Sequence, residues 1–206
     1  MAIEIFRPFG PSIVKLNIPE NIVQAMNLYV DKISQNKEKS NKLNYGDKLA
    51  GHVQQEFFLE VEFMKKINWA EFLASACAEW ISKEKNIKLK GFEIIKSWIV
   101  RQFKNEYNPI HFHSGHVSGV GYLKVPEDMG DTTQKEKKNN LNGKLVLIDG
   151  SKKLFCKPTY TITPKVGDFY LFPNYLLHTV YPFVGTDEER RSVSFNAKLD
   201  SESASL

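Results

Sequence analysis

The chain has 206 residues and a formal net charge of +4, with 42% hydrophobic and 25% charged residues. This balance is typical of one globular domain that buries a sizeable core. No hydrophobic stretch approaches the roughly 18 residues that a membrane-spanning helix needs, and the N-terminus has no signal-peptide pattern, so we expect no membrane partner.

The basic residues and the cysteines exclude two further classes of protein. Basic residues are dispersed along the chain and not gathered into one stripe with exposed aromatics, which argues against a nucleic-acid partner. Two cysteines, Cys77 and Cys156, do not amount to a disulfide framework. Cys77 lies in a hydrophobic run and is expected in the core. A reducing, cytoplasmic location follows as the expectation.

Two helices are predicted in the first half of the chain. Residues 19–34 carry Ile22 and Met26 at helical spacing, within a longer run of hydrophobic residues that recur every three or four positions. Residues 69–85 carry Phe72 on a second hydrophobic face with the same period. The intervening segments lack such a period, so residues 1–15 are expected as an extended lead-in and residues 35–56 as a surface loop or lid.

From Phe92 onward the hydrophobic period changes to the alternation of strands. Strands are predicted at 92–103, 111–113, 117–125, 145–148, 160–164, 168–172, 178–181 and 190–198, with a polar loop at 127–144. Helices followed by many short strands predict an α+β fold that is mainly β, with N-terminal helices packed on a β-sandwich or jelly roll. We expect one domain over residues 1–206, in which 1–90 support a core of 91–200.

Three of the five histidines suggest a metal site. Side chains at i and i+2 of a strand point to the same side, so His111 and His113 would aim two imidazoles into one space. Imidazole suits iron, zinc, copper and nickel. A third ligand must come from elsewhere, and His178, at the start of a later strand, is the best candidate. His52 and His116 are not expected to be ligands.

The strand after His178 carries a basic residue and a hydroxyl on one face. Arg190 and Ser192 alternate with Arg191 along this strand, so they would share a side. A guanidinium beside a hydroxyl is suited to holding a carboxylate. An aromatic lining from Trp98, Phe112, Phe169 and Phe172 would exclude water from the same space.

Residues 98–126 and 164–196 resemble the 2-oxoglutarate and Fe(II)-dependent oxygenase superfamily, near its prolyl-hydroxylase-like branch and its small bacterial and phage members. The segments that carry the resemblance are His111-Phe112-His113, Ser118–Pro126, Gly167–Pro173, His178 and Arg190–Asn196. The resemblance implies a double-stranded β-helix, which is a jelly roll with the metal between its two sheets. For a phage-encoded chain, the host cytoplasm would be the location.

The resemblance also implies roles for individual residues. Fe(II) would be held by His111 and His178, with His113 as the third ligand. 2-Oxoglutarate would be held by Arg190, Ser192 and Tyr122, with Arg191 as the alternative to Arg190 for its far carboxylate. O2 is the other co-substrate, and ascorbate a further reductant. The enzyme would hydroxylate an unidentified substrate, with a peptide or protein residue as the leading class and a small metabolite as the next.

One position departs from the family pattern. Position 113 is His where most members have Asp or Glu, so the site would lack a negative ligand. This leaves zinc, copper or nickel open beside iron. Glu127 and Asp149 are the candidates in the chain for a carboxylate ligand, but neither belongs to a motif, and His113 is kept as the ligand.

Two other kinds of jelly-roll protein are the alternatives. A cupin-type metal enzyme also uses a His-x-His pair and a later His, but it usually adds a Glu shortly after the pair, and none follows His113 here. A non-catalytic module that binds a sugar or a protein is the second alternative. Such a module has no need for three converging histidines.

Overall fold

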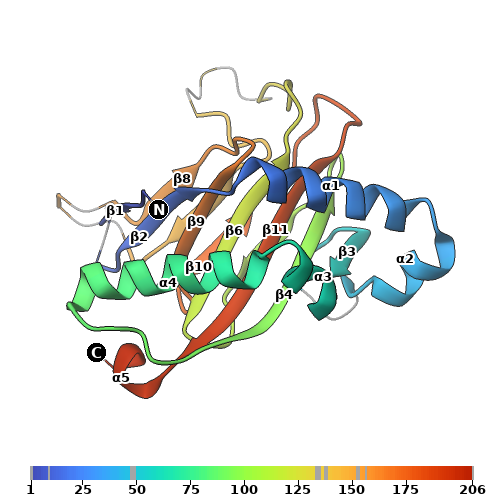
Figure 1. Ribbon diagram of the computed structural model, residues 1–206. Helices are drawn as coiled ribbons and strands as arrows, with labels where there is room; N and C mark the ends of the chain where they lie inside the picture. The colour runs from blue at the N-terminus through green and yellow to red at the C-terminus, as the bar shows by residue number, and fades with distance from the viewer. Residues whose placement is uncertain are drawn as a thin grey trace.

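A computed structural model describes residues 2–8, 10–46, 50–132, 136, 139–151, 154–155 and 157–205. It contains two antiparallel sheets, with helices across the outer face of the larger one (Figure 1). The helices are α1 (Glu20–Ser34), α2 (Lys37–Leu43), α3 (Val61–Lys66), α4 (Trp69–Lys85) and α5 (Ser201–Ala204). In the described part of the chain, none of these helices is long and hydrophobic enough to cross a membrane.

The strands form a seven-stranded and a four-stranded sheet. The larger has the order β1 (Glu4–Phe6), β2 (Ile13–Asn17), β9 (Asp168–Pro173), β6 (Val117–Lys124), β11 (Arg190–Leu199), β4 (Phe92–Gln102) and β3 (Gln55–Phe58). The smaller has the order β5 (Asn108–His111), β10 (Leu177–Val180), β7 (Leu145–Ile148) and β8 (Thr159–Ile162). These two sheets with their N-terminal helices are the double-stranded β-helix that the sequence predicts.

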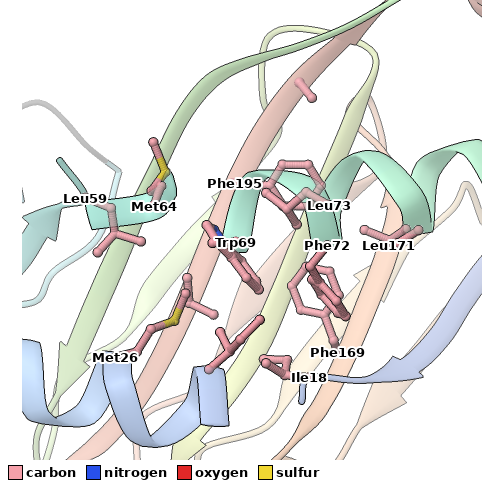
Figure 2. Close-up of a cluster of buried hydrophobic side chains, with 14 of the residues drawn as sticks. Ile18, Met26, Leu59, Met64, Trp69, Phe72, Leu73, Phe169, Leu171 and Phe195 are labelled. Carbon is pink, nitrogen blue, oxygen red and sulfur yellow. The ribbon is translucent and has the colours of Figure 1, made fainter. Parts of the chain in front are cut away.

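The main hydrophobic core lies between the helices and the larger sheet. Met26 of α1 and Trp69 and Phe72 of α4 pack against Phe169 of β9 and Phe195 of β11, and Figure 2 shows these side chains meeting above the sheet. Burial of such large side chains stabilises the fold by about 2 kcal/mol each. The core therefore fixes β9 and β11, two of the strands whose other faces look toward the smaller sheet.

The alternation of β11 divides its side chains between two environments. Val193 and Phe195 belong to the helix-side core, whereas Arg190, Ser192 and Ser194 line a cavity on the opposite side of the sheet. A second hydrophobic cluster closes the space between the sheets. It contains Tyr122 and Phe172 from the larger sheet and hydrophobic residues of β7, β8 and β10 from the smaller.

The two long helices and the later strands agree with the sequence-based expectations to within two residues, except at the His111 segment. There the strand runs from Asn108 to His111 and ends before His113. Cys77 is buried in α4 as expected, while Cys156 lies outside the described residues.

The expected lead-in and loop are wrong in part. Residues 1–15 contain β1 and most of β2, and residues 35–56 contain α2 and the start of β3, so three strands from the first 90 residues extend the larger sheet. In β2 consecutive residues are buried on both faces, which removes the alternation that marks a strand. In α2 Leu43 is the buried residue, which leaves no hydrophobic face to detect.

Candidate active site

The three histidines predicted to act together converge in the structure. His178 of β10 is paired in register with His111 of β5, which places both rings on the inner side of the smaller sheet. His113 follows β5 and is held in place by Asn174, whose carbonyl accepts from the backbone N–H of His113 at 3.0 Å. The side-chain amide of Asn174 also donates to the His113 carbonyl at 2.9 Å. One potential ligand atom from each histidine lies within 4.8 Å of the others.

The hydrogen bonds of the rings direct Nε2 toward the common centre. Nδ1 of His111 lies 2.7 Å from the Pro109 carbonyl, and Nδ1 of His178 lies 2.9 Å from the Leu176 carbonyl. A carbonyl only accepts, so each Nδ1 carries the proton and each Nε2 presents a lone pair. This arrangement fits a metal ion held by three imidazoles.

Burial keeps these imidazoles uncharged. Burial and, to a smaller extent, the neighbouring His111 together lower the pKa of His178 to about 4. Burial and the other two rings hold the pKa of His113 far below its ordinary value, and burial also lowers that of His111. Neutral imidazole is the form that binds metals.

A carboxylate does not complete this group. Among the residues that the structure describes, the clustered ligand atoms belong to the three histidines, and neither Glu127 nor Asp149 joins them. The other two histidines lie elsewhere. His116 accepts a hydrogen bond from the Leu199 backbone at 2.9 Å, and His52 stacks on Tyr107, so both are engaged in packing.

Arg190 places a buried positive charge in the same cavity. It is 1% exposed, and its Nη1 donates to Oε1 of Gln102 at 3.1 Å. Among the described residues, no hydrogen bond of ordinary geometry is made by its Nε or Nη2, or by the hydroxyl of the adjacent Tyr122, although this hydroxyl lies close enough to interact with the guanidinium. The guanidinium lies 5.1 Å from the Tyr122 ring centre, and burial lowers the Arg190 pKa. A buried guanidinium with two free donors suits a carboxylate of a ligand.

Arg191 points to the other side of the sheet and has its partners within the protein. Its guanidinium donates to both carboxylate oxygens of Glu189, at 2.6 and 2.9 Å, and to Asp31 of α1 at 2.7 Å. Arg101 of β4 binds the same Glu189 at 2.8 and 2.9 Å. Arg191 therefore anchors α1 to the sheet, and Arg190 alone of the pair faces the cavity.

The cavity has a volume of about 210 Å³ and contains the three histidines, Arg190 and Ser192 in its lining. Of the aromatic residues expected there, Trp98, Phe112 and Phe172 line it. Phe169 does not, because the alternation of β9 turns it into the helix-side core against Trp69.

Four polar residues of the lining were missed at the level of sequence: Glu56, Lys96, Gln102 and Asn108. Glu56 lies in β3, at a position where a surface loop was expected from the sequence. Lys96 and Asn108 sit in β4 and β5 without any motif spacing that relates them to the histidines. One signal in the sequence could have identified Lys96. The alternation of β4 places it on the same face as Trp98, which was expected to line the site.

Comparison with known proteins gives the same fold. Residues 96–196, which contain all the predicted site residues, match the family described as "Putative 2OG-Fe(II) oxygenase", where 2OG is 2-oxoglutarate. No curated protein matches the chain.

Several solved structures resemble the whole chain at low sequence identity. A Pseudomonas putida prolyl-4-hydroxylase is 15% identical, with 91% of each chain covered and a TM-score of 0.57. A collagen prolyl hydroxylase from Paramecium Bursaria Chlorella virus-1 is 13% identical, with 90% of this chain and 94% of that chain covered and a TM-score of 0.54. AviO1 from Streptomyces viridochromogenes is 11% identical, with 92% and 90% covered and a TM-score of 0.60. The solved structures show that the whole chain shares their fold. The match over residues 96–196, which bear the site, identifies this part of the chain as a member of the 2OG-Fe(II) oxygenase family, a family of enzymes.

Proposed function

We propose that this enzyme is a 2-oxoglutarate- and Fe(II)-dependent dioxygenase that hydroxylates a substrate still to be identified. The observation that carries the proposal is the convergence of His111, His113 and His178 in one cavity with the unpaired guanidinium of Arg190. Three neutral nitrogen ligands suit Fe(II), and a buried cation with free donors suits a dicarboxylate co-substrate. We also infer that residues 1–206 act as one oxygenase domain.

Each part of the site has a distinct task in this proposal. His111, His113 and His178 would hold the metal, which supplies the oxidation of substrate by O2, coupled to conversion of 2-oxoglutarate to succinate and CO2. Arg190 would bind the far carboxylate of 2-oxoglutarate, assisted by the hydroxyls of Ser192 and Tyr122. Trp98 and Phe172 would exclude water from the space between them.

Fold similarity to prolyl hydroxylases makes a peptide or protein residue the leading substrate class, with a small metabolite as the next. Both alternatives from the sequence explain less of the cavity. A cupin-type metal enzyme would use the histidines but has no need of Arg190. A non-catalytic module would need neither the histidines nor Arg190. The buried guanidinium, which forms no ion pair among the described residues, would then destabilise the fold without binding a ligand.

The test is formation of succinate from 2-oxoglutarate with Fe(II), O2 and ascorbate, together with anaerobic measurement of Fe(II) binding. We expect both in the unaltered protein and neither in His111→Ala or His178→Ala. His52→Phe is the matched control, because it removes a histidine outside the group and keeps the stacking on Tyr107. Absence of succinate, together with unchanged Fe(II) affinity in both alanine variants, would overturn the proposal.

A further inference from the structure

The lining of the cavity contains a second group of polar residues, separate from the histidines and Arg190. Glu56 of β3 and Asn108 of β5 both line it. Glu56 is paired in register with Val100 of β4, and Val100 is paired with Ser192 of β11, so the carboxylate stands two strands away from Ser192 on the same face. At about 4.8 Å per strand, that separation is roughly 10 Å.

Each of these residues has a buried oxygen atom that can accept a hydrogen bond but has no donor among the described residues. Glu56 is 1% exposed, yet among the described residues its Oε2 has no hydrogen-bond partner. The Oδ1 of Asn108 is likewise buried and unpartnered. A buried acceptor without a donor costs about 1–3 kcal/mol, and more when it is charged, so such groups are retained where a ligand completes them. 2-Oxoglutarate cannot complete them, because it too offers acceptors at neutral pH.

The charged groups that face Glu56 do not neutralise it. Lys96 of β4 attracts it, and Glu106, from the segment between β4 and β5, repels it. Among the described residues, Lys96 forms no ion pair with Glu56. Glu106 is already engaged with the backbone N–H groups of Gln54 and Phe103. Among the residues that the structure describes at this end of the cavity, two acidic groups therefore face one basic group.

The main chain of residues 50–53 closes over the two acceptors. A Cβ added to Gly51 would overlap Oδ1 of Asn108 and would lie 3.3 Å from Oε1 of Glu56. The absence of a side chain at Gly51 thus lets this segment pack against the pair, and both Glu56 and Asn108 belong to the lining of the cavity. The acceptors are held in place by their surroundings and are not free to turn toward solvent.

We propose that the primary substrate carries a protonated nitrogen, an ammonium or guanidinium group, which Glu56 and Asn108 bind while another part of the substrate lies beside the histidines. This inference rests on the proposed function for what happens to the bound molecule, but the binding itself does not need turnover. The same chemistry could come from a free amino compound or from a Lys or Arg side chain of a peptide.

Calorimetric titrations of the Mn(II)-loaded protein, with and without 2-oxoglutarate, would test the proposal. The probes are L-lysine and L-arginine capped as N-acetyl N-methylamides, each compared with its equally capped uncharged counterpart, norleucine or citrulline. Free lysine and free arginine, whose α-ammonium is a second cation, are titrated beside them. The variants are Glu56→Gln, which removes the charge and keeps the shape, and Asn108→Ala. Glu93→Gln is the control, because it removes a carboxylate from an exposed position of β4.

We expect at least one cationic probe to bind roughly tenfold tighter than its uncharged counterpart, a difference typical of a desolvated charge-assisted hydrogen bond. That preference should disappear in Glu56→Gln, weaken in Asn108→Ala and persist in Glu93→Gln. Comparison of free and capped probes tells whether a small molecule or a peptide is preferred. Equal binding of charged and uncharged probes, a preference that survives Glu56→Gln, or binding of none of the cations would each overturn the inference. Failure of 2-oxoglutarate to bind would count against the proposed function, and the titrations without it would still test the cation site.

Discussion

The Nε2 atoms of His113 and His178 face each other at 3.1 Å. Because Nδ1 of His178 donates to the Leu176 carbonyl, Nε2 of His178 carries a lone pair, and the proton between the rings must come from His113. A metal ion that replaces this proton would gain two nitrogen ligands at once, and Nε2 of His111 would supply the third.

The first prediction concerns the position where the family has an acid. In His113→Asp a carboxylate offsets one positive charge of the ion, whereas His113→Ala removes a ligand outright. We expect His113→Asp to bind Fe(II) roughly tenfold or more tightly than His113→Ala, as judged by anaerobic calorimetry. If His113→Ala matched the unaltered protein, His113 would not be a ligand.

A second prediction separates the ligand-binding role of Arg190 from stability. Arg190→Met keeps an unbranched side chain as far as the position of Nε and removes a buried charge that has few partners. We expect 2-oxoglutarate to bind roughly tenfold to a hundredfold more weakly, with no loss in the free energy of unfolding. Titration of the ligand and denaturant unfolding measure the two effects. Unchanged 2-oxoglutarate affinity would remove Arg190 from the binding site.

The neighbouring ion-pair network should behave in the opposite way. Glu189 holds both Arg101 and Arg191, so Glu189→Gln leaves the buried Arg191 and the partly buried Arg101 without their shared carboxylate. We expect a loss of about 3–5 kcal/mol in the free energy of unfolding at pH 7, measured by denaturant titration. A loss below about 1 kcal/mol would mean that the network holds no more than exposed ion pairs do.

The same carboxylate gives the network a defined pH dependence. Burial raises the pKa of Glu189, but hydrogen bonds from Arg101 and Arg191 outweigh burial and lower it to about 2. A folded-state pKa below the unfolded value means that this stability is present above about pH 4.5 and is lost as the pH falls toward 2. The difference between Glu189→Gln and the unaltered protein should therefore shrink over that window.

Glu56 should have the reverse dependence. Burial and the nearby Glu106 raise its pKa to about 7, and Lys96 offsets this in part. A folded-state pKa above the unfolded value means that stability falls as the pH rises from about 4.5 to about 7. Glu56→Gln lacks this cost, so above pH 7 it should be more stable than the unaltered protein by about 1–3 kcal/mol, and by far less at pH 5. Equal stability at pH 8 would mean that the Glu56 carboxylate is compensated in the folded protein.

Much of the fold could be predicted because its patterns are local. α1 and α4 bury one face each, so a period of three to four residues revealed both. The alternation of β11 likewise separated Arg190 and Ser192 from Val193 and Phe195. β2 and β3 were missed because their burial depends on which strands pair with them, and that pairing is a long-range property.

The site was predictable only where residues form a motif. His111, His113 and His178 follow a recognisable order along the chain, and the structure brings them together. Phe169 was assigned to the wrong side because the start of an alternation does not say which face is the core. Glu56 became visible only when β3 was placed beside β4.

Anaerobic titration of 2-oxoglutarate into the Fe(II)-loaded protein is the most direct test of the site as a whole. We expect binding of one equivalent in the unaltered protein, little or none in His178→Ala, and roughly tenfold or greater weakening in Arg190→Met. Binding that is equally strong in all three proteins, or that does not need the metal, would contradict the assignment of this cavity as a 2-oxoglutarate and Fe(II) site.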